Sequence, residues 1–261
     1  MKSKINILFK KISILLWFFL HPNYYQHLLY LVVRKFLPNH DKKKDKNKAL
    51  KWASSNAVRY VDVFKKLGLK GNLKGLDKNS IAEGLRLQNK SSLKMGGAAH
   101  IHLLYDCVRL IKAKRVLETG VAYGWSSLSI LKALHDNQKG RLYSIDMPYP
   151  VKNNEKNVGI VVPNYLKKKW KLIRRPDRPG INIGLKKAGG KIDLCHYDSD
   201  KSWWGRAYAY NILWNSLKSN GVFITDDIQD NLYFFEFVKK KSSKFAIVEY
   251  EKKFIGLIRK L

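Results

Sequence analysis

The stretch that most constrains the fold is Arg115 to Ser127, with the sequence RVLETGVAYGWSS. Its first residues predict a short buried strand that ends near Glu118, and the residues from Trp125 onward have helical spacing. Between them, Gly120 and Gly124 predict a turn in which the backbone can approach a ligand where a Cβ atom would collide. A strand, a glycine turn and a helix form one βα unit of an open α/β sheet, and ligands bind such sheets at the carboxyl ends of the strands.

The rest of the chain continues this alternation of strand and helix. Strands are predicted at 115–119, 141–146, 170–174, 191–198, 221–226, 245–250 and 254–260. Helices are predicted over 49–67 and 96–112 and near 125–136, 203–217 and 230–240, whereas residues 68–92 are expected to be irregular. Alternating units predict a parallel sheet. Because only a few residues around Glu251 join the last two strands, we expect a terminal hairpin and a seven-stranded sheet whose last strand is antiparallel.

A second acidic residue narrows the choice of ligand. The dinucleotide fingerprint would need glycine at the positions of Ala122 and Trp125, so a nicotinamide cofactor is not favoured. Asp146 ends the next predicted strand, 28 residues after Glu118. A carboxylate at that place can accept hydrogen bonds from both hydroxyls of a ribose.

Glu118 followed by Gly120 and Gly124 resembles the first motif of class I S-adenosylmethionine (SAM) methyltransferases. The resemblance implies a Rossmann-like sheet and SAM as cofactor, with Glu118 on the methionine amine, Ser126 beside the glycine turn and Asp146 on the ribose. A broader similarity to bacterial methyltransferases of the "methyltransferase 24" type covers about residues 93 to 240. It rests on VLETGVAYGWSS, GRLYSIDMP, VGIVVP, YDSD and GVFITDDIQDN, in that order.

The chain departs from that family at two places. Family members often carry Gly-Asp after the third strand, where this chain has Arg175-Pro176 followed by Asp177. The resemblance therefore implies that Asp177 replaces the missing acid on the adenine side. Lys201 stands where the family usually has histidine.

Two acidic loops end the fourth and fifth predicted strands, HYDSD at 196–200 and ITDDIQDN at 224–231. Adjacent parallel strands deliver both loops to one edge of the sheet, so Asp198, Asp200, Asp226 and Asp227 should converge. Crowded carboxylates repel one another, and a hard divalent cation with oxygen ligands relieves that repulsion. We expect Mg²⁺ or a similar ion on Asp198, Asp226 and Asp227. The alternative is that some of these aspartates cap the helices that follow.

The same loops resemble those of metal-dependent O-methyltransferases of the catechol and antibiotic-sugar types. The resemblance implies transfer of a methyl group from SAM to a hydroxyl of a small molecule, sugar or glycan, with Asp200 as the base and Asp198 also catalytic. His100, His102 and His196 are alternative bases.

The N-terminal part differs from the rest of the chain. We divide the sequence into an apolar and basic segment (1–40), a basic linker with a helical cap (41–92) and the SAM-dependent domain (93–261). Residues 1–40 predict two helices, rich in aromatic residues and flanked by lysines, that lie in a membrane interface. A signal anchor and a helical hairpin packed on the domain are the rival interpretations.

The net charge of +31 favours an anionic partner. We expect an anionic membrane surface bound through residues 1–51, which places the protein in the cytoplasm, peripheral on the inner face of the membrane. The two cysteines, Cys107 and Cys195, stand in apolar contexts and indicate neither a disulfide framework nor a zinc site.

Two other functions remain open. The charge also suits a nucleic-acid methyltransferase, but an acidic site would repel phosphate, so nucleic acid is the weaker partner. A non-catalytic membrane-surface protein that retains the SAM fold is the second alternative.

Overall fold

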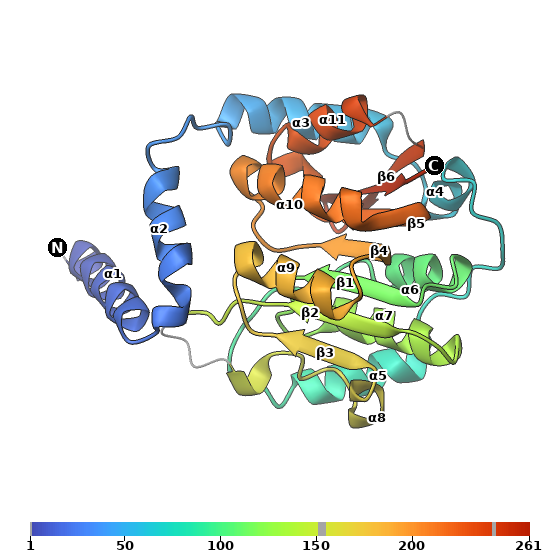
Figure 1. The fold of residues 1–261 in the computed structure, drawn as a ribbon, viewed down its shortest axis with the longest axis horizontal. Helices are drawn as coiled ribbons and strands as arrows, with labels where there is room; N and C mark the ends of the chain where they lie inside the picture. Colours follow the sequence, from blue (N-terminus) through green and yellow to red (C-terminus); the bar gives the residue numbers. More distant parts are fainter. Residues whose placement is uncertain (1, 151–154, 242–243) are drawn as a thin grey trace.

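The computed structural model describes residues 2–150, 155–241 and 244–261, so Met1 and residues 151–154 and 242–243 lie outside the description. Its centre is a seven-stranded sheet in the order β3-β2-β1-β4-β5-β7-β6 (Figure 1). The strands are β1 (Arg115–Thr119), β2 (Arg141–Ile145), β3 (Trp170–Ile173), β4 (Ile192–Tyr197), β5 (Leu217–Thr225), β6 (Lys244–Tyr250) and β7 (Lys253–Arg259). The first five strands run parallel, and β7 is antiparallel to both neighbours. The predicted Rossmann-like sheet is confirmed.

Helices cover both faces of this sheet, because successive residues of each strand point to opposite sides. Val116 belongs to the core shared with α6 (Ile101–Leu110) and α7 (Trp125–Asp136). Leu117 belongs to the opposite core, shared with α9 (Asp177–Lys187), α10 (Trp203–Ser216) and α11 (Tyr233–Lys240). This doubly covered sheet leaves the carboxyl ends of the parallel strands free to form a site.

The predictions for the region before the sheet need two corrections. Residues 68–92 are not irregular throughout, because α5 (Lys78–Gln88) begins at Asp77, whose carboxylate accepts a hydrogen bond from the backbone N–H of Ser80 at 2.8 Å. The single helix predicted over 49–67 is two helices, α3 (Lys43–Asn56) and α4 (Tyr60–Lys66). The break occurs where Val58 donates its backbone N–H to the carbonyl of Ile247 in β6 at 2.8 Å.

The N-terminal segment forms α1 (Lys2–Phe19), the short 3₁₀ turn η1 (Pro22–Tyr24) and α2 (Tyr25–Arg34). In Figure 1 these helices stand to one side of the sheet and its covering helices. Among the described residues, no helix is both long and apolar enough to cross a membrane. The charge run that follows is largely helical in α3, which buries Ala49 and Ala53 and pairs Lys46 with Asp230 at 2.9 Å.

Candidate functional site

The glycine turn after β1 has the backbone geometry that the sequence predicts. Gly120 and Gly124 have φ angles of +80° and +90°, in the left-handed region that side chains with a Cβ disfavour. A Cβ atom on Gly120 would lie 2.1 Å from the backbone carbonyl oxygen of Asp198. The turn and the loop after β4 therefore touch through their backbones, and this contact requires glycine.

A cavity of about 470 Å³ lies at this edge of the sheet. It is lined by nine of the ten site residues predicted from the sequence, namely Gly120, Gly124, Ser126, Asp146, Asp177, Asp198, Asp200, Asp226 and Asp227. The convergence predicted for the two acidic loops is therefore present. Sequence reasoning did not anticipate that α2 also contributes to the wall, through His27, Tyr30, Leu31 and Arg34.

Glu118 is the exception, because it is fully buried and does not line the cavity. Its Oε2 accepts hydrogen bonds from the hydroxyls of Ser127 (2.5 Å) and Ser144 (2.6 Å). Its Oε1 lies 3.6 Å from Nδ1 of His196. The carboxylate expected to hold a ligand amine instead contacts side chains of α7, β2 and β4.

Asp146 is held at the cavity wall by two groups. Its Oδ1 accepts the backbone N–H of Val121 at 2.8 Å, and its Oδ2 pairs with the guanidinium of Arg174. Burial raises the pKa of Asp146. Arg174 also pairs with Glu155 at 2.8 Å. The sequence did not reveal the role of Arg174, because the residue appears there only as the last position of the predicted strand 170–174.

Asp177 begins α9 and faces the loop after β4. Its Oδ2 accepts hydrogen bonds from the hydroxyls of Ser199 (2.5 Å) and Tyr197 (3.3 Å). Burial raises the pKa of Asp177 to about 6. The residue is therefore part of the cavity wall, with its carboxylate turned toward β4.

Lys201 lies between two of the predicted metal ligands. Its Nζ is 3.0 Å from Oδ1 of Asp198 and also pairs with Oδ2 of Asp227, while Nζ of Lys253 is 3.4 Å from Oδ1 of Asp227. Burial alone would lower the pKa of Lys201, but the carboxylates of Asp198 and Asp227 raise it. Burial and the neighbouring Asp226 raise the pKa of Asp198 to about 6.

The third predicted ligand, Asp226, faces a buried histidine. Nε2 of His196 lies 3.3 Å from Oδ1 of Asp226. Burial lowers the pKa of His196, but Asp226 and Glu118 outweigh that effect and raise it to about 10. Three cationic groups, Lys201, Lys253 and His196, thus face the three carboxylates expected to bind a metal. Because these cations already pair with the carboxylates, the arrangement as it stands does not fit a magnesium site. Within the described part of the chain, no group of three or more His, Cys, Asp or Glu side chains is arranged to hold a metal ion.

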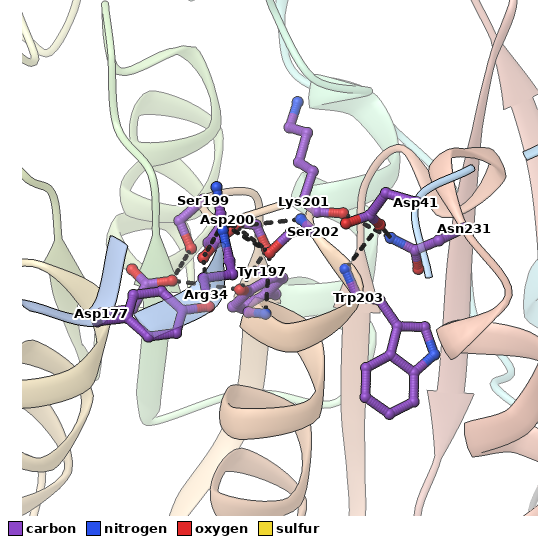
Figure 2. A network of polar contacts seen from close by, with 12 residues as sticks. Arg34, Asp41, Asp177, Tyr197, Ser199, Asp200, Lys201, Ser202, Trp203 and Asn231 are labelled. Carbon is purple, nitrogen blue, oxygen red and sulfur yellow. Dashed lines mark hydrogen bonds and ion pairs between the residues drawn. The ribbon is translucent and has the colours of Figure 1, made fainter. Parts of the chain in front are cut away.

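Asp200 belongs to a network of polar contacts that reaches α2 on one side and, through the hydroxyl of Tyr197, Asp177 on the other (Figure 2). Its carboxylate lies 3.3 Å from Nη1 of Arg34 and accepts the backbone N–H and hydroxyl of Ser202 at 3.1 and 2.7 Å. The hydroxyl of Tyr30 donates to it at 3.4 Å. Ser202 is the N-cap of α10, so Asp200 joins α2 to the start of that helix.

Two further residues that the sequence analysis did not identify hold the acidic loops in place. Arg206 is fully buried, and its Nη2 donates to the backbone carbonyls of Asp226 (3.1 Å) and Asp227 (2.7 Å). Asn231 donates to the backbone carbonyl of Lys201 at 2.9 Å. The arginine stands in the apolar helical run WWGRAYAYNILW, which is the signal that could have revealed it.

The fold and this cavity together define a methyltransferase-type α/β domain. Residues 117–228 match the family described as "Methyltransferase domain", of the methyltransferase 24 type. This part of the chain is therefore similar to that methyltransferase family. Sequence comparison with curated proteins gives no significant match.

Solved structures support the same fold. A putative O-methyltransferase from Klebsiella pneumoniae is 16% identical with a TM-score of 0.54, and the match covers 80% of this chain and 100% of that chain. An O-methyltransferase from Bacillus cereus in complex with SAH is 15% identical with a TM-score of 0.54, with the same coverage. The O-methyltransferase TomG from Streptomyces achromogenes, in complex with SAM, is 16% identical with a TM-score of 0.53, covering 72% of this chain and 93% of that chain. At these identities the likeness shows the fold alone.

Proposed function

We propose that this protein is a SAM-dependent O-methyltransferase acting on a hydroxyl of a small molecule, sugar or glycan. The observation that carries the proposal is one cavity bounded by the glycine turn, by Asp146 and by both acidic loops. A methyl donor and an acceptor must meet in such a space, because the transfer requires the two reacting atoms in line. The SAM- and SAH-bound structures with the same fold support this choice of donor.

The residues on the donor side fit SAM, which when bound supplies a methyl group on a positively charged sulfonium. Gly120 and Gly124 line the cavity with backbone in the positive-φ conformation that glycine permits. Asp146 offers a carboxylate at the carboxyl end of β2, where a ribose hydroxyl can donate to it. Arg174, already on Asp146, keeps that carboxylate oriented.

The acidic loops supply a base and a cation on the acceptor side. Asp198 lines the cavity with a pKa of about 6, close to the operating pH that suits general-base catalysis. It removes the hydroxyl proton while the oxygen forms its bond to the methyl carbon; the S–C bond breaks and its electron pair stays on sulfur. The ammonium of Lys201, 3.0 Å from Asp198, stabilises negative charge that develops on the acceptor oxygen.

Asp200 remains the alternative base. Its carboxylate already accepts from Arg34 and Ser202, so it has less capacity to take a proton than Asp198. Substitution of each aspartate by asparagine separates the two roles: loss of turnover with retained donor binding identifies the base.

The proposed transfer does not depend on metal assistance. The sequence predicts Mg²⁺ on Asp198, Asp226 and Asp227, and hard cations do take carboxylate ligands. Since Lys201 and His196 already face these carboxylates, no step is assigned to a metal.

Calorimetric titration with S-adenosylhomocysteine tests the proposed function. Asp146→Ala should weaken binding at least tenfold, about the effect of losing one hydrogen bond to a charged group. Asp62→Ala, which removes an exposed carboxylate of α4 paired with Arg59, is the matched control and should bind like the unaltered protein. Binding of NAD without binding of S-adenosylhomocysteine would overturn the proposal.

A further inference from the structure

α2 presents two different faces. Residues His27, Tyr30, Leu31 and Arg34 line the cavity. Tyr25, Leu29, Val32 and Val33 are exposed, as is Phe36 just after the helix. The spacings of three and four residues within each set place them on two opposite faces of one helix. A single helix is therefore both a wall of the site and an apolar part of the surface.

The exposed apolar surface is concentrated at this end of the molecule. Of the 16 large apolar side chains exposed among the described residues, ten lie between Ile12 and Phe36. Five of these are in α1 or just after it, at Ile12, Leu15, Leu16, Phe19 and Leu20. A concentration of exposed apolar side chains of this kind is typical of a site of contact with a partner or a membrane.

The charge of the segment identifies the partner. Residues 1–40 contain six lysines and arginines and no aspartate or glutamate. Asp41 to Lys51 then adds further lysines. Apolar side chains flanked by basic ones suit the surface of an anionic bilayer, where the former enter the headgroup region and the latter meet lipid charge.

Polar and cation–π interactions hold α2 against the rest of the site. None of its residues is fully buried. Arg34 pairs with Asp200 at 3.3 Å, and the guanidinium of Arg178 lies 4.0 Å from the ring centroid of Tyr30. Partly exposed contacts of this kind contribute little, so these interactions hold α2 on the cavity only weakly.

We propose, building on the O-methyltransferase function above, that the acceptor is a membrane-borne amphiphile whose hydroxyl-bearing head enters the cavity beneath α2. The outer face of α2 and the neighbouring face of α1 lie on an anionic bilayer. Because a helix is about 10–12 Å across, this position brings the cavity wall within one helix diameter of the lipid surface. A head group tethered to a lipid tail then reaches Asp198 without leaving the membrane.

The accessibility of an introduced cysteine first tests whether the outer face of α2 lies on the membrane. Cys107 and Cys195 are buried, so the background reaction with maleimide is small. Leu29→Cys places a thiol on the outer face, and Leu85→Cys, on α5, is the matched control at another exposed leucine. Vesicles of phosphatidylglycerol should slow labelling of Leu29→Cys by a water-soluble maleimide at least tenfold and leave Leu85→Cys unchanged. Vesicles of phosphatidylcholine alone should have a smaller effect.

A lipid-tethered probe tests the acceptor. Leu31→Cys places a thiol on the cavity side of α2. In phosphatidylglycerol vesicles it should react with a maleimide attached to a phosphatidylethanolamine head group, whereas Leu85→Cys should not. Reaction of Leu31→Cys with soluble maleimide but not with the lipid-tethered one would overturn the membrane-borne acceptor.

Two other outcomes would overturn the proposed contact between α2 and the membrane. If vesicles leave the labelling of Leu29→Cys unchanged, the outer face of α2 does not lie on the membrane. The same conclusion follows if sedimentation velocity shows a dimer and the thiol is protected from maleimide without lipid. Calorimetry with S-adenosylhomocysteine on the unaltered protein and on Leu29→Cys keeps the two proposals apart. Absent binding would refute the proposed function, whereas retained binding with failed lipid-probe reaction would refute this inference alone.

Discussion

Arg34 and Asp200 form a 3.3 Å ion pair that joins residues 166 positions apart in the chain. It connects α2 to the loop after β4, so an N-terminal helix completes a site that the sheet begins. Asp200, the alternative base, thereby also holds a wall of the cavity.

Removing this pair should loosen α2 with little effect on the sheet. Arg34→Ala should speed hydrogen exchange in residues 25–34 by about fivefold or less, because such pairs contribute up to about 1 kcal/mol. Hydrogen–deuterium exchange with mass spectrometry measures this. Arg59→Ala, which breaks the exposed pair with Asp62, is the control and should leave α2 unchanged. Equal exchange in Arg34→Ala and the unaltered protein would show that other contacts hold the helix.

The glycine turn should tolerate no side chain at Gly120. Gly120→Ala should destabilise the protein by at least about 2 kcal/mol, since a positive φ costs about 1–2 kcal/mol and the new Cβ meets the Asp198 carbonyl. Gly97→Ala is the matched control, because a Cβ there meets no atom within 4 Å. Urea unfolding of both variants gives the comparison. Similar loss in the two variants would argue against the backbone contact as the cause.

The buried His196 should make stability depend on pH. Its folded pKa is raised to about 10 by Asp226 and Glu118 against the opposing effect of burial. A raised pKa means that its contribution is fully present below the unfolded value of about 6.5 and is lost as pH rises toward 10. The difference in unfolding free energy between the unaltered protein and His196→Gln should therefore shrink from pH 6.5 to pH 10.

Urea unfolding at several pH values measures this difference, and His135→Gln, at an exposed histidine, is the control. A difference that is constant with pH would mean that His196 is neutral in the folded protein.

Lys201 should compete with a divalent cation for Asp198 and Asp227. Lys201→Met removes a positive charge between the two carboxylates, so Mn²⁺ should bind at least about tenfold more tightly, a change of about 1.4 kcal/mol. Calorimetry with Mn²⁺ alone measures this, with Lys46→Met as the surface control. If the unaltered protein already binds Mn²⁺ as tightly as the variant, the metal site predicted on Asp198, Asp226 and Asp227 is supported instead.

The sheet could be predicted because each strand is a short apolar run followed by a turn. Helix α9 was not predicted, since Pro179, Gly180 and Gly184 weaken the helical pattern. Both glycines lie against Ile145 of β2, where a Cβ on Gly180 would come within 2.4 Å of the isoleucine side chain. Close packing on the sheet therefore outweighs local propensity.

The site could be predicted as a set of carboxylates at one edge, but their partners could not. Glu118 looks like a ligand-binding acid in the sequence, yet Ser144 on the neighbouring strand and His196 on β4 enclose it. Asp200 looks free until α2 brings Arg34 to it. Such pairings depend on three-dimensional contacts between distant segments, which spacing along the chain does not reveal.

The contact between residues 57–58 and β6 limits how far the chain can be shortened. Ala57 forms a parallel bridge to Ile247, and Val58 donates to the same residue, so this segment covers part of the outer edge of the sheet. Removing α1 and α2 leaves that cover in place. A chain that starts after Val58 would present unpaired backbone groups of an outer strand to other molecules, and such edges promote aggregation. The residues between α3 and α4 thus prevent the edge strand β6 from pairing with the sheet of another copy.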